Sequence, residues 1–472
     1  MVDGDGSMTA EKNKFSLWFL AWPIFVELLL QLLLGAVDTL MVSRVSDDAV
    51  AVVGLANQIF QAVMILFMTV ASGAGILIAQ KLGAKQHESA RTVGIMAVTI
   101  SGLIGAVLSV ILYVEAVPLA RLFHLEERLL PLAHTYISIV GSGMVLTALT
   151  ATLTTTIRNT GNTKGPMIVA IGMNVIHVIL NYGWINGAFG FPQLGLQGVA
   201  ISTLISRLLA TCLLLYMFVS VFERKIRWRD LAVFNRKLFS EIIKIGWPMG
   251  VNMSSWVLSQ LAIYTILATM GASALAARTY MNTLESICFM LGYSIALSAQ
   301  IQIAHLFGSG QTKAAYKAGY RATWIGLALV GCNSIILFLI GKSFLGLFTS
   351  DTAIVQLALS CIGLTAFLQP GRMINMGFGN ALNAIGDTRF NMVISLCSMW
   401  GVAAGLSYVL GLHFGWGLAG IYVAMMCDEY LRGILVAIRW RKKKYLRLAE
   451  GRTKSIESTV RSEGGKRKVY SA

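Results

Sequence analysis

Twelve long apolar segments constrain the fold of this chain more than any other feature of its sequence. A bilayer core about 30 Å thick takes roughly 20 consecutive apolar residues to cross as a helix. Only 13% of the 472 residues are charged, about half the fraction usual in soluble domains. The sequence therefore predicts an all-α polytopic membrane protein. The predicted spans are residues 15–43, 50–79, 91–115, 131–157, 165–189, 197–222, 240–269, 274–303, 318–341, 353–383, 389–411 and 418–440.

The two ends of the chain lie outside the predicted spans. Residues 1–14 are expected to be a cytoplasmic segment, and the leading MVDGDGS before Met8 is typical of a cloning remnant. The first span is too long for a removable signal peptide and lacks a small-residue cleavage site. Residues 441–472 are rich in basic residues, which predicts a basic cytoplasmic tail at the membrane surface.

The chain has a net charge of +16, but its positive residues are distributed as in a membrane protein and do not indicate a nucleic-acid partner. Lysine and arginine gather in the loops after the second, sixth and twelfth spans, all on the side of the N-terminus. Cytoplasmic loops of membrane proteins carry such an excess of positive charge. We therefore predict a multi-pass protein of the cell membrane with both termini cytoplasmic.

The six cysteines all fall inside apolar segments and form no C-x-x-C pair. They are most simply small buried hydrophobic residues, so neither a disulfide framework nor a metal site is expected. We also expect no cofactor.

The chain repeats itself at an offset of 225 residues. Trp22-Pro23 recurs as Trp247-Pro248, and other matches keep the same offset over most of both halves. An even number of spans per half makes the repeats parallel, related by an axis along the membrane normal. The other matches are Asn57 with Asn282, residues 78–86 with 303–311, and residues 157–164 with 382–389.

This duplication predicts two pseudo-symmetric six-helix lobes. The N-lobe is expected over residues 15–222 and the C-lobe over residues 240–440, with a basic cytoplasmic linker at 223–239. Two such lobes can rock against each other around a central cleft.

One polar stripe lies within the first span. Glu27, Gln31, Gly35 and Asp38 fall on one helical face, because eleven residues bring a helix back to nearly the same azimuth. A carboxylate among apolar residues costs several kcal/mol unless it is protonated, paired or hydrated. We interpret Asp38 and Glu27 as proton-coupling acids, with a bend at Pro23 and Gly35. The alternative is a pair of acids satisfied by neighbouring helices.

The stripe has no acidic counterpart in the second half. The 225-residue offset carries Glu27, Gln31, Gly35 and Asp38 onto Asn252, Trp256, Gln260 and Ile263. An acidic stripe in one lobe alone is what a coupling-ion site in that lobe would produce.

The fifth span carries a second polar face. Asn174, His177 and Asn181 follow one another at steps of three and four. Together with Gln31, Asn57 and Thr203 they are candidates for a substrate- or cation-binding pocket in the N-lobe. The alternatives are amides that hold helices together and, for His177, a satisfied core histidine.

The second half holds intramembrane charges of both signs. Glu285 and Arg372 are candidates for lining the cavity of the C-lobe, as are Asn252, Trp256 and Gln260. A further set in the last span is expected to form structural ion pairs. That set is Asp428, Glu429 and Arg432.

Several of these features together resemble the multidrug and toxic compound extrusion (MATE) family. They are the Gly-[Asp/Asn]-Thr-[Lys/Arg] pattern at 161–164 and 386–389, the two Trp-Pro pairs, and Asp38 fifteen residues after Pro23. The resemblance covers about residues 15–440. It implies twelve helices in two six-helix lobes, and cation- or proton-driven antiport of amphipathic, often cationic, organic compounds.

Within that family, the chain is more similar to the DinF-like prokaryotic branch than to NorM-type members. The latter carry acids in the seventh and tenth helices as a sodium site, whereas the matching positions here hold Trp256 and Arg372. The DinF-type branch relies on the aspartate of the first helix, here Asp38. The chain departs from it at Asn181, where DinF-type members commonly have aspartate, and this leaves the ion and its stoichiometry open.

The sequence thus indicates a monomeric secondary antiporter that exports amphipathic or cationic compounds in exchange for protons. Sodium coupling stays open. A lipid-linked oligosaccharide flippase of related architecture is a rival, although more cationic residues would be expected in its cavity. An intramembrane enzyme is less favoured, because the chain has no HExxH motif, no phosphate-cradling loop and no long loop for a catalytic domain.

Overall fold

The computed structural model describes residues 15–123, 125–222, 230, 234–346 and 348–443. Within these residues the regular structure is helical and contains no strand. The predicted N-terminal segment, most of the linker and the tail from residue 444 onward lie outside the described residues. What the sequence predicts for these segments therefore stays a prediction.

The N-terminal half provides six membrane-crossing units, as predicted. The fourth consists of two helices that meet at Gly143 with a bend of 42°. The helices are α2 (Leu17–Ser43), α3 (Asp47–Gly83), α4 (His87–Val114), α5 (Ala116–Leu122), η1 (Glu127–Leu129), α6 (Leu130–Ser142), α7 (Met144–Asn159), α8 (Lys164–Asn186), η2 (Ala188–Gly190) and α9 (Leu196–Val221).

The C-terminal half repeats this plan. Its fifth unit passes through two π-helical stretches, η4 and η5, between residues 399 and 413. The helices are α10 (Arg236–Thr269), α11 (Ala272–Gly308), α12 (Thr312–Leu345), α13 (Thr352–Ala384), α14 (Thr388–Ser398), η4 (Met399–Ala404), α15 (Gly405–Ser407), η5 (Tyr408–His413) and α16 (Gly417–Arg441).

Ten of the described helices are long and apolar enough to cross a membrane, and the bent pair α6–α7 makes eleven. The last helix, α16, is long enough but interrupts its apolar run with charges, among them Asp428, Glu429 and Arg432. With α16 included, the predicted all-α fold of twelve membrane-crossing helices is confirmed.

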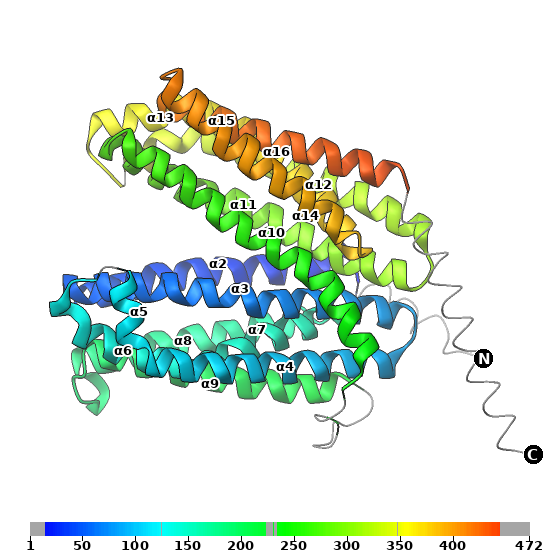
Figure 1. Cartoon of the computed structure of the whole chain (residues 1–472), viewed down its shortest axis with the longest axis horizontal. Helices are drawn as coiled ribbons and strands as arrows, with labels where there is room; N and C mark the ends of the chain where they lie inside the picture. The colour runs from blue at the N-terminus through cyan, green and yellow to red at the C-terminus, as the bar shows by residue number, and fades with distance from the viewer. Residues whose placement is uncertain (1–14, 124, 223–229, 231–233, 347, 444–472) are drawn as a thin grey trace, which may run out of the picture.

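The helices form two bundles that diverge from one end (Figure 1). Helices α2 to α9 make the first bundle, the N-lobe, and α10 to α16 make the second, the C-lobe. The lobes lie against each other at the end where α2 begins and α16 ends, and separate toward the opposite end. Most contacts between lobes join α3 to α10 and α11, and α2 to α11.

The first turns of α2 belong to the interface between the lobes. Leu20 and Ile24 pack with Ile301 of α11 in one buried cluster. Farther along, α2 leaves the C-lobe and packs against α8 of its own lobe. Pro23, the predicted hinge, lies inside this helix and is buried. A single helix therefore connects the C-lobe to the N-lobe pocket described below.

Glycines allow the lobes to approach closely. A Cβ added to Gly73 of α3 would lie 2.3 Å from the Ile242 carbonyl oxygen of α10, and one added to Gly250 would lie 2.1 Å from Thr69 Oγ1. Real Cβ atoms do not come so near, so only glycine permits this separation of the helices.

Candidate functional site

Asp38 lies in the second half of α2, where that helix faces α8. Its Oδ1 accepts a hydrogen bond of 3.1 Å from Asn181 Nδ2, and His177 Nδ1 lies 3.3 Å from the same oxygen. The side chain is 30% exposed, and Oδ2 has no partner among the described residues. The carboxylate thus keeps one oxygen for a proton, an ion or a substrate.

Helices α8 and α9 hold the groups around Asp38. His177 Nε2 lies 3.1 Å from Thr203 Oγ1. Ser202 Oγ donates to Asn181 Oδ1, which fixes the Asn181 amide so that its NH₂ group points at the carboxylate. Both amide ends of Asn181 are therefore used, and the side chain is fully buried.

Four predicted pocket residues therefore come together: Asp38, His177, Asn181 and Thr203. Asn174 takes a different place, because its amide donates to the Leu30 carbonyl oxygen at 3.3 Å. That bond holds α8 against α2, as expected of an amide that joins helices.

Arg207 adds a positive charge to this pocket. It lies one turn after Thr203 on α9, so the two side chains share a face. Its Nη1 donates to Thr147 Oγ1 of α7 at 2.9 Å. The guanidinium acts electrostatically on Asp38 and on the buried Tyr136 of α6. The N-lobe pocket therefore contains a carboxylate and a positively charged guanidinium.

Glu27 is separate from this pocket. Arg158 of α7 donates from Nη2 to both carboxylate oxygens of Glu27, each at 2.9 Å. Glu27 is 5% exposed, and Tyr293 of the C-lobe lies within electrostatic range of Arg158. The polar stripe of α2 thus divides into a paired acid near the interface between the lobes and a partly open acid farther along.

Gln31 and Gly35 of the stripe, and Asn57 of α3, do not take part in the group around Asp38. Gln31 and Asn57 are exposed, and a Cβ at Gly35 would meet nothing within 4 Å. No hydrogen bond or ion pair in the described part of the chain joins them to Asp38. They therefore do not complete the polar group around Asp38.

Glu285 lies in the interior of the C-lobe, not on an open cavity wall. It is 1% exposed and its carboxylate contacts four side chains from three helices. Arg278 Nη1 lies 3.1 Å from Oε1, Tyr422 OH donates to Oε1 at 2.8 Å, Thr365 Oγ1 donates to Oε1 at 3.3 Å, and Arg372 Nη1 donates to Oε2 at 3.0 Å.

Arg372 links this cluster to the charges of α16. Its Nε lies 3.7 Å from Glu429 Oε1, which in turn lies 3.1 Å from Arg432 Nη2. Arg432 also donates to Asp428 through Nε at 3.0 Å. Acids and bases alternate along this chain of contacts, as expected for structural pairing of the α16 charges.

The three α10 residues that were predicted to line the C-lobe cavity lie apart from both charged clusters. Asn252 and Gln260 are half-buried and Trp256 is 44% exposed. They recur every fourth residue, so they line one side of α10. No hydrogen bond or ion pair among the described residues joins them to Asp38 or to Glu285.

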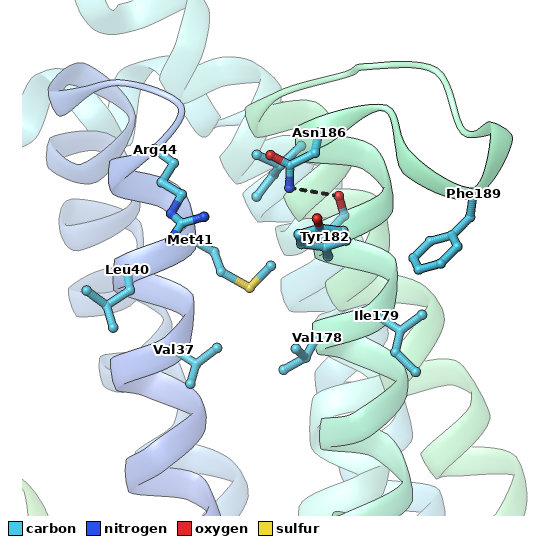
Figure 2. Close-up of a pocket in the computed structure, with 10 residues that line it drawn as sticks. Val37, Leu40, Met41, Arg44, Val178, Ile179, Tyr182, Asn186 and Phe189 are labelled. Atoms are coloured by element: carbon cyan, nitrogen blue, oxygen red, sulfur yellow. Dashed lines mark hydrogen bonds between the residues drawn. The ribbon is translucent and has the colours of Figure 1, made fainter.

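A cavity of about 370 Å³ lies between α2 and α8 on the side of the N-lobe (Figure 2). Its walls are mostly apolar, with Arg44, Tyr182 and Asn186 at the polar end. Asp38 and Asn181 are not among its lining residues. The cavity is thus adjacent to the charged pocket and separate from it. The other lining residues are Val37, Leu40, Met41, Val178, Ile179, Ile185 and Phe189.

Three arginines of these clusters were not chosen from the sequence. Arg207 follows Thr203 by four residues, Arg158 lies within the repeated segment 157–164, and Arg278 precedes Glu285 by seven. The spacings of Arg207 and Arg278 place each on the helical face of a polar residue, and the repeat marks Arg158; these signals could have found them. Among the described residues no three or more His, Cys, Asp or Glu side chains gather to hold a metal ion.

Two helical bundles that meet at one end, with buried charges inside each, define a polytopic membrane transporter. A family model named MatE matches the chain over residues 23–183 and again over 248–409. The chain belongs to this family, the multidrug and toxic compound extrusion family. The two matches begin 225 residues apart, which is the offset of the internal repeat.

Relatives cover nearly the whole chain. It is 34% identical over 432 residues to the uncharacterized transporter YisQ of Bacillus subtilis, covering 92% of this chain and 95% of YisQ. It is 27% identical to a probable multidrug resistance protein NorM of Thermotoga maritima, covering 90% of this chain and 93% of that protein.

Solved structures share the fold. A structure described as MATE in the bent conformation superposes with a TM-score of 0.84 at 17% identity, covering 92% of this chain and 96% of the other. A mutant of the Vibrio cholerae MATE transporter VcmN superposes with a TM-score of 0.82 at 18% identity, covering 93% of this chain and 98% of the other. At this level of identity the likeness concerns the fold alone.

Proposed function

We propose that this protein is a proton-driven antiporter that exports amphipathic organic compounds by alternating access. The observation that carries the proposal is Asp38, a partly open carboxylate that accepts a hydrogen bond from Asn181 and lies 3.3 Å from His177 Nδ1, between α2 and α8. Such a group can alternate between a charged and a protonated form inside the membrane.

Proton coupling is favoured over sodium coupling by the ligands around Asp38. Sodium prefers several oxygen ligands, as other hard cations do. Here Asn181 Oδ1 already accepts from Ser202, and the Arg207 guanidinium acts on the same carboxylate. In the C-lobe, Arg372 is engaged with Glu285 and Glu429.

The proposed transport cycle depends on α2, because this helix packs against both lobes. Protonation of Asp38 removes the charge that attracts Asn181 and Arg207, so α2 can repack against α8. Because α2 also packs on α11 at the interface, its movement can be transmitted to the C-lobe. If the basic loops mark the cytoplasmic side, the lobes diverge toward the outside and the structure is outward-facing.

The relatives' names support an exported substrate. NorM of Thermotoga maritima is described as a probable multidrug resistance protein. We extend that role to this chain as export of small amphipathic molecules from the cell by a monomer. A flippase is less favoured, because three arginines inside the C-lobe, Arg278, Arg372 and Arg432, are engaged with acids. An enzyme is less favoured because the chain belongs to a transporter family.

Reconstituted vesicles test the proposal. A fluorescent cation should be transported when a proton gradient alone is imposed, and not when a sodium gradient alone is imposed at clamped pH. Sodium-driven transport with no response to protons would overturn the coupling assignment. Translocation of a lipid-linked sugar, without movement of the dye, would favour the flippase instead.

A further inference from the structure

Exposed basic side chains gather at one end of the C-lobe, where α12 begins and α16 ends. The two helix ends pack together, since the rings of Tyr316 and Trp440 stack with their centroids 6.1 Å apart. Lys443 Nζ lies over the Tyr316 ring, 5.0 Å from its centroid, and Arg441 acts electrostatically on Tyr320. We call this cluster the C-lobe basic patch. Its members are Lys313, Lys317, Arg321, Arg441, Lys442 and Lys443.

The α12 part of the patch continues into an apolar face. Lys313, Lys317 and Arg321 follow one another at steps of four, so they lie within a sector of about 80° around the helix axis. Farther along α12 the same sector carries large apolar side chains that are well exposed. They are Trp324 at 65%, Ile335 at 61% and Leu339 at 72%. One side of α12 is therefore basic in its first turns and apolar along the rest of the span.

The patch keeps its positive charge. Among the described residues, no carboxylate forms an ion pair with any of its six cations. The next basic residue along α16 behaves differently, because Arg439 Nε lies 2.8 Å from Asp387 Oδ2. Residues 444–472, which follow directly, hold more basic than acidic residues. The patch is therefore suited to an anion from outside the chain.

The internal repeat shows that this cluster is particular to the C-lobe. The 225-residue offset relates its three α12 cations to residues of α4 that carry no positive charge. Those residues are Glu88, Thr92 and Met96. In the place of Lys313, Glu88 lies 3.6 Å from Arg91 and pairs with it. The excess of basic residues in cytoplasmic loops applies to both halves and does not account for such a difference between two repeated helices.

We propose that the C-lobe basic patch binds anionic phospholipids, with the headgroup phosphate on the cations and an acyl chain along Trp324, Ile335 and Leu339. Basic clusters at the membrane ends of transmembrane helices bind anionic headgroups. Trp324 follows Arg321 by one turn, a place typical of the aromatic belts of membrane proteins. The site lies on α12 and α16 and does not depend on which ion drives transport.

The apolar continuation favours a lipid over a soluble phosphate. Both carry the phosphate that lysine and arginine recognise. A small phosphate would meet the cations and leave the exposed face from Trp324 to Leu339 uncovered. A lipid covers both parts, and the long side chains of Lys313, Lys317 and Arg321 can reach toward its headgroup while their stems lie on apolar surface.

Thermal unfolding of the full-length protein in a non-ionic detergent tests the proposal, because a ligand that binds the folded state raises the melting temperature. Dioleoylphosphatidylglycerol, dioleoylphosphatidylcholine and glycerol 3-phosphate are added separately at equal phosphate concentration. The first shares its acyl chains with the second and an anionic phosphate with the third. We expect it to half-saturate at a concentration at least about tenfold lower than either, since each Lys or Arg near an anionic surface strengthens binding several-fold. Added salt should weaken this response.

Substitutions locate the site. The triple variant Lys313→Gln, Lys317→Gln and Arg321→Gln should raise the half-saturating concentration of phosphatidylglycerol by about tenfold or more. Without lipid it should melt as the parent does, since these side chains are exposed. Lys313→Arg with Lys317→Arg keeps the charge and should keep the parent response. The matched control removes three exposed charges at the same end of the molecule. It is Lys85→Gln, Lys237→Gln and Lys244→Gln.

Three results would overturn the lipid site. Equal responses to phosphatidylglycerol and phosphatidylcholine would show that the headgroup charge is not recognised. Equal losses in the patch variant and the control variant would show an effect of net charge alone. A response to glycerol 3-phosphate as strong as that to phosphatidylglycerol would show a phosphate site without lipid docking. None of these results bears on proton-driven transport, which the vesicle experiment tests separately.

Discussion

Gly83 and Gly308 occupy equivalent places in the two halves and make reciprocal contacts across the interface between the lobes. A Cβ added to Gly83 of α3 would lie 2.0 Å from the carbonyl oxygen of His305, and one added to Gly308 of α11 would lie 2.0 Å from that of Gln80. Gln80 and His305 are themselves related by the 225-residue offset. The two close contacts that join the lobes at this end are therefore related by the internal repeat.

Gly83→Ala should prevent the lobes from closing at this end. The new methyl group meets backbone, which cannot turn aside, and overpacking of this kind costs about 1–3 kcal/mol. We expect transport to fall at least about tenfold, since that free energy biases the lobes away from the described state. Distances between spin labels on α3 and α11 should increase in the variant.

The matched control is Gly331→Ala on α12, where a Cβ would meet nothing within 4 Å. Its transport should equal that of the parent protein, and its stability should be unchanged or higher, since alanine favours helix by about 1 kcal/mol over glycine. Normal transport by Gly83→Ala with unchanged label distances would mean that the crossing of α3 and α11 need not be this tight.

Asp38→Asn should abolish gradient-driven transport and leave the protein folded. The amide keeps the shape of the side chain and can still meet Asn181, but it cannot carry a proton. Transport in vesicles, with thermal unfolding in detergent as the check on folding, measures both effects. Asp47→Asn, at an exposed aspartate in the first turn of α3, is the control. Parent-like rates in Asp38→Asn would exclude Asp38 as the coupling acid.

Glu27→Gln should act mainly on stability. It leaves the Arg158 side chain, which is only 14% exposed, without its counter-charge, and removal of one partner of a buried ion pair costs about 3–5 kcal/mol. The double variant Glu27→Gln with Arg158→Gln removes both charges and should recover much of that loss in thermal unfolding. If the double variant is stable yet still lacks transport, the pair also has a role in coupling.

Glu285→Gln should destabilise the C-lobe more than any exposed substitution. The change leaves Arg278 and Arg372 without the carboxylate that both contact, with an expected cost of about 3–5 kcal/mol. Glu127→Gln is the control, because its ion pair with Arg121 is exposed and such pairs contribute about 0–1 kcal/mol. A melting temperature that is equally lowered in both variants would contradict a structural role for the Glu285 cluster.

The sequence by itself determined the helical membrane fold, the twelve spans, the duplication and the family. These follow from local composition and from spacing along one chain, which need no knowledge of contacts. It also placed Asp38, His177, Asn181 and Thr203 in one pocket, since helical periodicity sets which residues share a face. The predicted domain limits and the termini on the cytoplasmic side stay predictions.

Only the tertiary structure decided which charges are paired. Glu27 and Asp38 share a stripe in the sequence, yet one meets Arg158 of α7 and the other meets α8. Glu285 is enclosed among helices that sequence spacing could not bring together. Periodicity fixes the direction in which a side chain points. Its partner depends on how distant helices pack, and that is what separates the paired carboxylate of Glu27 from the partly open carboxylate of Asp38.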